Sequence, residues 1–144
     1  MQRTCLFCDR TKLTLEHVWP DWVSRYLYGS PRRGRFTAVR YDGPNRTPVG
    51  KPFQAAELNH KARLVCSKCN NGWMSDAEHC AKPVLQPLLS GHTVTLNAQD
   101  QATLRAWIVL RAMILERSGS APGASPFYTD EERLAFGDID LRVR

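Results

Sequence analysis

The stretch Leu64-Val65-Cys66-Ser67-Lys68-Cys69-Asn70-Asn71 carries an apolar pair into a Cys-x-x-Cys pair, and Cys5-Leu6-Phe7-Cys8 supplies a second pair near the start of the chain. A two-residue gap lets both thiolates of one pair reach a single ion, and zinc favours four such ligands in a tetrahedron. In a reducing compartment, paired cysteines of this spacing indicate a metal rather than disulfides. The alternatives are two unrelated reduced pairs or a redox pair. The sequence therefore predicts a structural zinc held by Cys5, Cys8, Cys66 and Cys69, while Cys80 is expected to be a small buried residue.

A Glu-His dipeptide lies between the two cysteine pairs, within Leu15-Glu16-His17-Val18-Trp19-Pro20. Alternation of polar and apolar residues over 12–18 predicts a short strand that brings it there. A neutral imidazole is a suitable base near pH 7, and a carboxylate is a suitable hard ligand for magnesium or manganese. Taken alone, however, the dipeptide favours an exposed glutamate and a half-buried histidine with no catalytic role.

In combination, these motifs resemble the HNH endonuclease family, whose core is the ββα-metal motif. That pattern has a Cys-x-x-Cys pair, then Asp/Glu-His followed by an apolar residue and a Pro, and later an apolar pair that leads into Cys-x-x-Cys-Asn. The continuation Asn70-Asn71-Gly72-Trp73-Met74 resembles that of the family members with Gly-Trp-Met after the second cysteine pair. The resemblance covers residues 5–20 and 60–76. It implies an α+β fold: a small zinc-stapled ββα-metal core, treble-clef-like, with a long basic insertion and added C-terminal helices.

The resemblance also implies roles for individual residues. His17 would be the general base that activates water, and Glu16 would be a ligand of a catalytic magnesium or manganese ion, where Asp is commoner in the family. Asn70 would be the other protein ligand, with Asn71 as its alternative. The residue that orients the base in the family falls here at Lys61. Asn59 and His60, just upstream, are the candidates to replace it.

The positive charge of the chain is concentrated in one segment. The net charge is +6, yet the segment from Arg25 to Arg63 holds nine Lys and Arg residues against Asp42 and Glu57, a local charge of +7. A concentrated basic segment favours a polyanionic partner, although a solvated surface loop has the same composition. The residues expected to bind nucleic acid, most simply duplex DNA, are Arg32, Arg33, Arg35, Arg40, Arg46, Lys51, Lys61 and Arg63.

The 144 residues are enough for one compact domain. Residues 1–96 would form the HNH-like part, with the basic insertion at about 29–58, and 97–144 a helical extension packed on it. Within the insertion, a strand is expected over 36–41 with a turn at 42–44. A helix over 72–81 is expected to stop before Pro83. The clearest helix is expected to begin at the Asn97 cap. Its predicted apolar stripe is Leu104, Trp107, Ile108, Ala112 and Leu115, and Thr129 to Glu132 is typical of a capping box that opens a last short helix.

The sequence shows no apolar segment typical of a signal peptide or a membrane span, so we expect a cytoplasmic protein with no membrane partner. The leading hypothesis is a metal-dependent DNA endonuclease that hydrolyses phosphodiester bonds. The alternative is a catalytically inactive, zinc-stapled HNH-like module that binds nucleic acid or a protein. A third hypothesis is an interaction domain that forms a homodimer or binds a protein partner through the C-terminal helices.

Overall fold

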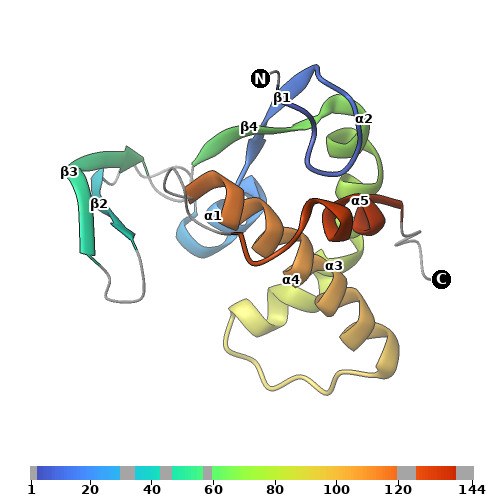
Figure 1. The fold of residues 1–144 in the computed structure, drawn as a ribbon. Helices are drawn as coiled ribbons and strands as arrows, with labels where there is room; N and C mark the ends of the chain where they lie inside the picture. The colour runs from blue at the N-terminus through green and yellow to red at the C-terminus, as the bar shows by residue number, and fades with distance from the viewer. Residues whose placement is uncertain (1–2, 30–34, 43–46, 57–59, 120–125, 139–144) are drawn as a thin grey trace.

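The structure is a computed structural model that describes residues 3–29, 35–42, 47–56, 60–119 and 126–138. It is a mixed α+β fold, as the sequence predicts. The fold contains two small antiparallel sheets, β1–β4 and β2–β3. Most of the helices come after the second cysteine pair along the chain (Figure 1). The strands are β1 (Leu13–His17), β2 (Arg35–Asp42), β3 (Thr47–Ala56) and β4 (Lys61–Cys66). The main helices are α1 (Asp21–Tyr28), α2 (Ser67–Cys69), α3 (Ser75–Leu89), α4 (Ala98–Gly119) and α5 (Asp130–Asp138).

The sheet β1–β4 carries both the Glu16-His17 dipeptide and the approach to the second cysteine pair. Its register pairs Thr14 with Val65 and then Leu15 with Arg63, so the ladder shifts by one residue at this point. Such a bulge bends a strand and increases its twist. Beyond the bulge the pairing is regular and sets His17 opposite Lys61.

The hairpin β2–β3 occupies most of the basic insertion and lies to one side of the helices (Figure 1). The strand expected at 36–41 is confirmed as β2, which continues to Asp42. The turn expected at 42–44 lies largely outside the described residues. The insertion therefore contributes an extended arm rather than a long irregular loop.

The helix after the second cysteine pair is longer than the sequence predicts. A π-helical turn, η1 (Asn70–Met74), interrupted by the non-helical backbone of Gly72, leads into α3. α3 passes through Pro83 and Pro87 instead of stopping before the first of them. Proline removes a backbone hydrogen bond to the carbonyl four residues earlier. Those carbonyls belong to His79 and Pro83, both exposed, where water can replace the lost donor.

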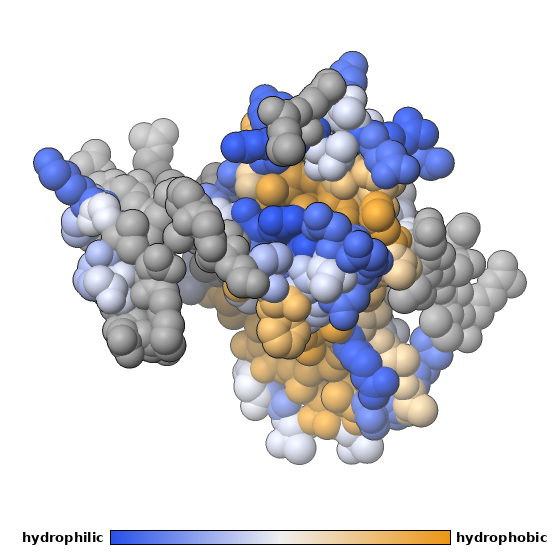
Figure 2. Space-filling model, viewed as in Figure 1, coloured by the Kyte–Doolittle hydropathy of each residue, from blue (hydrophilic) through white to orange (hydrophobic). Residues whose placement is uncertain are grey.

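The helix α4 begins as predicted, and the predicted apolar stripe is confirmed in part, because Leu104 and Trp107 are buried. Asn97 and Asp100 cap each other's backbone N–H groups. Ile108 and Leu115 of the predicted stripe are 56% and 48% exposed. The buried face is set by the position of α3 and β4 beside α4, not by apolar spacing alone, and apolar side chains gather where α3 and α4 lie (Figure 2). The buried residues of α4 are Leu104, Trp107, Leu110, Arg111, Met113 and Ile114.

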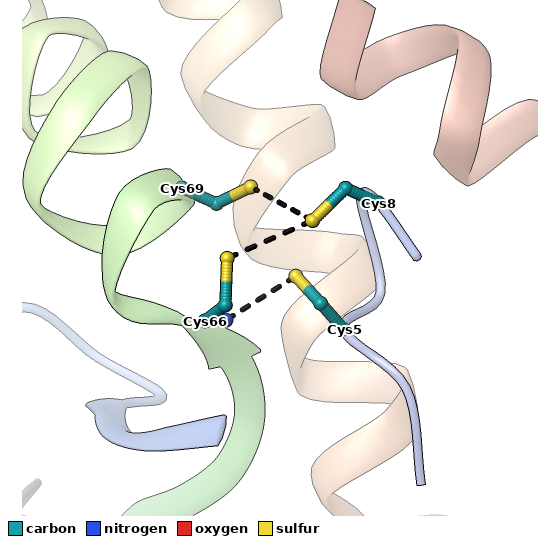
Figure 3. Close-up of side chains that lie close together, drawn as sticks. All are labelled: Cys5, Cys8, Cys66 and Cys69. Carbon is teal, nitrogen blue, oxygen red and sulfur yellow. Dashed lines mark hydrogen bonds between the residues drawn. The ribbon is translucent and has the colours of Figure 1, made fainter. Parts of the chain in front are cut away.

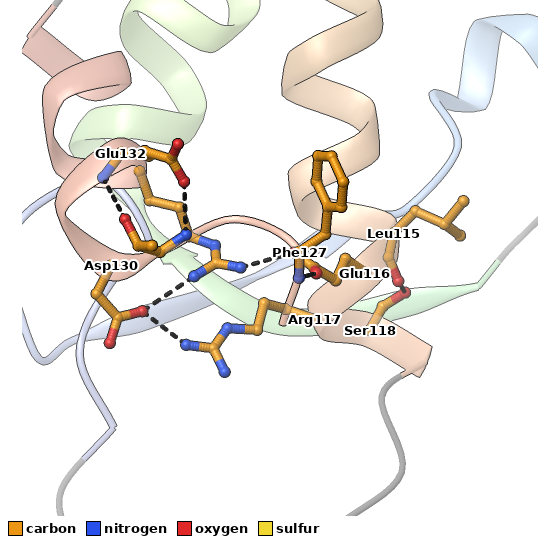
Figure 4. A network of polar contacts seen from close by, with 9 residues as sticks. Leu115, Glu116, Arg117, Ser118, Phe127, Asp130 and Glu132 are labelled. Atoms are coloured by element: carbon orange, nitrogen blue, oxygen red, sulfur yellow. Dashed lines mark hydrogen bonds and ion pairs between the residues drawn. The ribbon is translucent and has the colours of Figure 1, made fainter. Parts of the chain in front are cut away.

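The last helix is attached to α4 by one buried and one exposed ion pair (Figure 4). Arg133 of α5 is fully buried, and its guanidinium donates to Glu116 at 2.6 Å and to Asp130 at 3.0 Å. Arg117 of α4 pairs with the same Asp130 at 2.7 Å. The capping box predicted at Thr129 is confirmed, because Thr129 and Glu132 accept each other's backbone N–H groups.

The same helix closes over the first cysteine pair. Phe136 lies in an aromatic cluster with Phe7 and Trp73, with ring centroids 5.1 to 6.3 Å apart. Gly137 approaches Phe7 so closely that an added Cβ would lie 2.9 Å from the Phe7 Cβ. The prediction that Cys80 is buried is wrong. Cys80 is exposed on α3, because the buried face of that helix carries Ala77 and Ala81 instead.

Candidate metal centre and the site beside it

The four predicted zinc ligands lie together (Figure 3). Their Sγ atoms all lie within 4.8 Å of one another, with Cys8 Sγ 3.6 Å from Cys66 Sγ and 3.7 Å from Cys69 Sγ. A disulfide requires about 2.05 Å between sulfurs, whereas a tetrahedral zinc with Zn–S bonds of about 2.3 Å places them about 3.8 Å apart. The cluster therefore fits a metal ion such as zinc.

Backbone contacts around the cysteines hold the two distant segments in register. The Cys5 N–H donates to Arg10 O at 2.8 Å and closes the first loop, and the Leu6 N–H donates to Leu64 O at 3.0 Å. The Cys66 N–H in turn donates to Cys5 Sγ at 3.2 Å. N–H donors to sulfur stabilise a thiolate, which is the form that binds metal.

The thiols differ in how readily they lose a proton. Burial raises the pKa of Cys5 and of Cys69 above the usual value. Burial acts in the same direction on Cys66, but hydrogen bonds from the Cys69 backbone and from neighbouring thiols outweigh it and lower the Cys66 pKa to about 7. Four thiolates side by side repel one another, so a dication at the centre is what would make the fully deprotonated set favourable.

Glu16 and His17 have different surroundings. His17 is half-buried, whereas Glu16 is only 8% exposed and its Oε1 accepts a hydrogen bond from the Arg111 guanidinium at 3.0 Å. The same Arg111 nitrogen, Nη1, donates to the His17 carbonyl at 3.2 Å. A residue of α4 thus fixes both members of the dipeptide. Glu16, which the dipeptide taken alone predicts to be exposed, is a buried and charge-paired group.

Sequence analysis did not assign Arg111, Glu78 or Trp22 to the site, but the structure brings all three into one cluster with Glu16. Glu78 of α3 lies with its Oε2 3.8 Å from Arg111 Nη2, and its Oε1 accepts the indole N–H of Trp22 at 3.0 Å. Burial raises the Glu78 pKa, and the nearby Glu16 carboxylate raises it further, while Arg111 and the Trp22 hydrogen bond lower it. The sequence did contain one indication of this cluster. Arg111 stands among apolar residues of α4, and a buried charge requires a partner of opposite charge.

Asn70 lies close to β1 but is not in contact with Glu16 through its amide nitrogen. Its Nδ2 donates to Thr14 Oγ1 at 3.4 Å, two residues before Glu16 on the same strand. The Thr14 hydroxyl in turn donates to Val65 O at 3.1 Å. Asn70 is half-buried, and Asn71 is exposed. The structure therefore brings the start of the helical segment against the strand that carries the dipeptide.

The candidates for the orienting residue fall at the other end of β4. Lys61 is paired with His17 across the sheet, and the Val18 N–H donates to the carbonyl of the exposed His60 at 2.8 Å. Directly opposed residues have Cβ atoms about 4.5 to 5.5 Å apart, so Lys61 is the cross-strand neighbour of the histidine. Asn59 lies outside the described residues.

The expected nucleic-acid contacts are described only in part. Lys51 on β3 and Lys61 and Arg63 on β4 are exposed, and Arg63 also donates to Leu13 O at 3.4 Å. Arg35 and Arg40 lie on β2. Arg32, Arg33 and Arg46 lie outside the described part of the chain.

Comparison of the chain with protein-family models, with curated proteins and with solved structures gives no match. Within the described ranges, the group of residues with metal-ligand geometry is the four-cysteine cluster. No helix of the described part is both long and apolar enough to cross a membrane.

Proposed function

We propose that this protein is a metal-dependent DNA endonuclease of the HNH type, with a treble-clef-like core and His17 as the general base. The observation that carries the proposal is the placement of Glu16-His17 on a strand which the four-cysteine cluster holds against the segment that begins with Asn70. That is the arrangement of strand and helix that the resemblance to the family implies.

In this proposal, the half-buried His17 takes a proton from a water molecule, which attacks the phosphorus as the bond to the leaving oxygen breaks. The exposed Lys61, paired with His17 across the sheet, holds a phosphate of the backbone beside the base. Arg63, which is two residues further along β4 and also exposed, extends the same basic surface. These residues bind through charge, so the proposal predicts binding that weakens with salt.

The Glu16 carboxylate and the Asn70 side-chain carbonyl, the two ligands that the resemblance implies, fit a hard divalent cation by their chemistry, because both are oxygen ligands. A bound magnesium or manganese ion would stabilise the charge that develops on the phosphate and the leaving oxygen. The protein supplies an oriented carboxylate for it. In this structure that carboxylate is held by Arg111.

The test is plasmid cleavage by the zinc-loaded protein and two variants. Supercoiled plasmid is incubated with magnesium, manganese or EDTA and the parent, His17→Ala or His92→Ala. His92 is exposed and lies in the loop after α3, so its variant controls for loss of a histidine. We expect metal-dependent nicking by the parent and His92→Ala only. Equal cleavage by His17→Ala would refute the role of the base.

The second candidate is a zinc-stapled module that binds nucleic acid without cutting it. The observation in its favour is that Glu16, the expected metal ligand, is buried and already paired with a cation. A plasmid that shifts on a gel but stays uncut under every metal condition would favour this function over the nuclease.

A further inference from the structure

Two carboxylates from different elements converge on one guanidinium beside His17. Glu16 comes from β1, Glu78 from α3 and Arg111 from α4. Arg111 Nη1 lies 3.0 Å from Glu16 Oε1, and Nη2 lies 3.8 Å from Glu78 Oε2. The chain is thus folded so that segments up to 95 residues apart meet at one positive charge.

The charges in this cluster do not balance. Glu16 and Glu78 carry two negative charges when ionised, and Arg111 carries one positive charge. Arg111 has a side chain only 5% exposed, and its Nε has no hydrogen-bond partner among the described residues. A buried ion pair is favourable only when its geometry and hydrogen bonds are complete. A divalent cation would neutralise both carboxylates where the guanidinium neutralises one.

The two carboxylates differ in their access to solvent. The Glu78 side chain is 26% exposed and the Glu16 side chain 11%, so solvent ions reach the cluster more readily at Glu78. Trp22 contacts Glu78 through its hydrogen bond to Oε1 at 3.0 Å. Glu78 is therefore the more accessible ligand and Glu16 the deeper one.

We infer that Glu16 and Glu78 form a two-carboxylate cation seat beside His17, that Arg111 fills this seat in the present structure, and that a divalent cation competes with Arg111 for it. The inference deepens the proposed nuclease function and rests on it for the purpose of the ion. Binding of the ion does not require cleavage, so the two can fail separately.

The test uses terbium, a hard cation whose luminescence is sensitised by a nearby indole, on the zinc-loaded protein. Trp22 lies against Glu78, so terbium in the seat should give a sensitised signal that Trp22→Phe removes. Manganese, monitored by its free-ion electron paramagnetic resonance signal, measures the affinity without relying on Trp22. We expect Arg111→Met to bind manganese about ten-fold or more tightly than the parent, because the competing charge is gone.

Matched variants separate the seat from general charge effects. Arg105→Met removes an exposed arginine of the same helix and should leave the affinity unchanged. Adding Glu78→Gln to Arg111→Met should abolish the gain. An affinity for Arg111→Met equal to that of the parent would overturn the inference.

Two further measurements keep the inference testable if Arg111→Met does not fold, which circular dichroism reports. Arg111→Lys retains a charge but lacks the fork that spans two carboxylates, and should bind manganese with an affinity between those of the parent and Arg111→Met. In the parent itself, Glu78→Gln should reduce the sensitised terbium signal. An unchanged terbium signal in Glu78→Gln would refute the seat. If the seat is found but no plasmid is cut, the nuclease proposal fails and the cation site stands.

Discussion

Arg111 Nη1 donates to Glu16 Oε1 at 3.0 Å and to the carbonyl of the next residue, His17, at 3.2 Å. The buried guanidinium thus fixes the side chain of one residue and the backbone of the other. α4 is therefore part of the site, and its role is not limited to supporting the core. The four-cysteine cluster lies at the Leu13 end of β1, and Arg111 holds the other end.

The first prediction concerns the stability of this pair. Arg111→Met should lower the free energy of unfolding by about 3–5 kcal/mol, because it leaves the Glu16 carboxylate buried without a partner. Arg25→Met breaks an exposed pair with Asp21 and should cost no more than about 1 kcal/mol. Urea unfolding of the zinc-loaded proteins measures both. Equal losses would show that the Arg111 pair is not special.

The second prediction concerns the metal. Zinc bound by the four thiolates should contribute about 10 kcal/mol or more to folding, so a strong zinc chelator should unfold the domain. Cys66→Ser should lose stoichiometric zinc, and Cys80→Ser, which changes an exposed cysteine outside the cluster, should keep it. Zinc content and circular dichroism report the outcome. A chelated protein with its full helical signal would contradict a structural role.

The third prediction concerns the contact between α5 and the first cysteine pair. Gly137→Ala places a Cβ 2.9 Å from the Phe7 Cβ and should lower the free energy of unfolding by about 1–3 kcal/mol through overpacking. Ala135→Ser adds an atom at an exposed position of the same helix and should have little effect. Thermal unfolding compares the two. If both variants melt like the parent, α5 does not close tightly over Phe7.

The fourth prediction concerns DNA binding. Each phosphate contact that is lost should make the slope of log affinity against log salt concentration less steep by about 0.9. Lys61→Ala and Arg63→Ala should each weaken binding to duplexes of any sequence by this route. Arg105→Ala, which removes an exposed charge from α4, is the control. Fluorescence anisotropy over a series of salt concentrations gives the slopes. Identical slopes in all four proteins would remove β4 from the interface.

Local patterns in the sequence predicted the parts of the molecule that depend on neighbours along the chain. The two-residue spacing of each cysteine pair, the caps at Asn97 and Thr129 and the strand at β1 are all local, and the structure contains them. The helix after the second pair was predicted too short, because the cost of Pro83 depends on whether water reaches the carbonyl that it frees. That is a property of the surface and not of the local sequence.

Only the tertiary structure decided which faces are buried and which charges meet. The apolar residues of α4 allow more than one buried face, and the positions of α3 and β4 select the one that contains Arg111 and exposes Ile108. The sequence by itself determined which four cysteines cluster and the Glu16-His17 dipeptide. The pairing of Glu16 with Arg111, close to Glu78, follows from packing between segments that are distant in the sequence. A buried carboxylate requires a cationic partner, and only the tertiary fold decides which cation lies close enough.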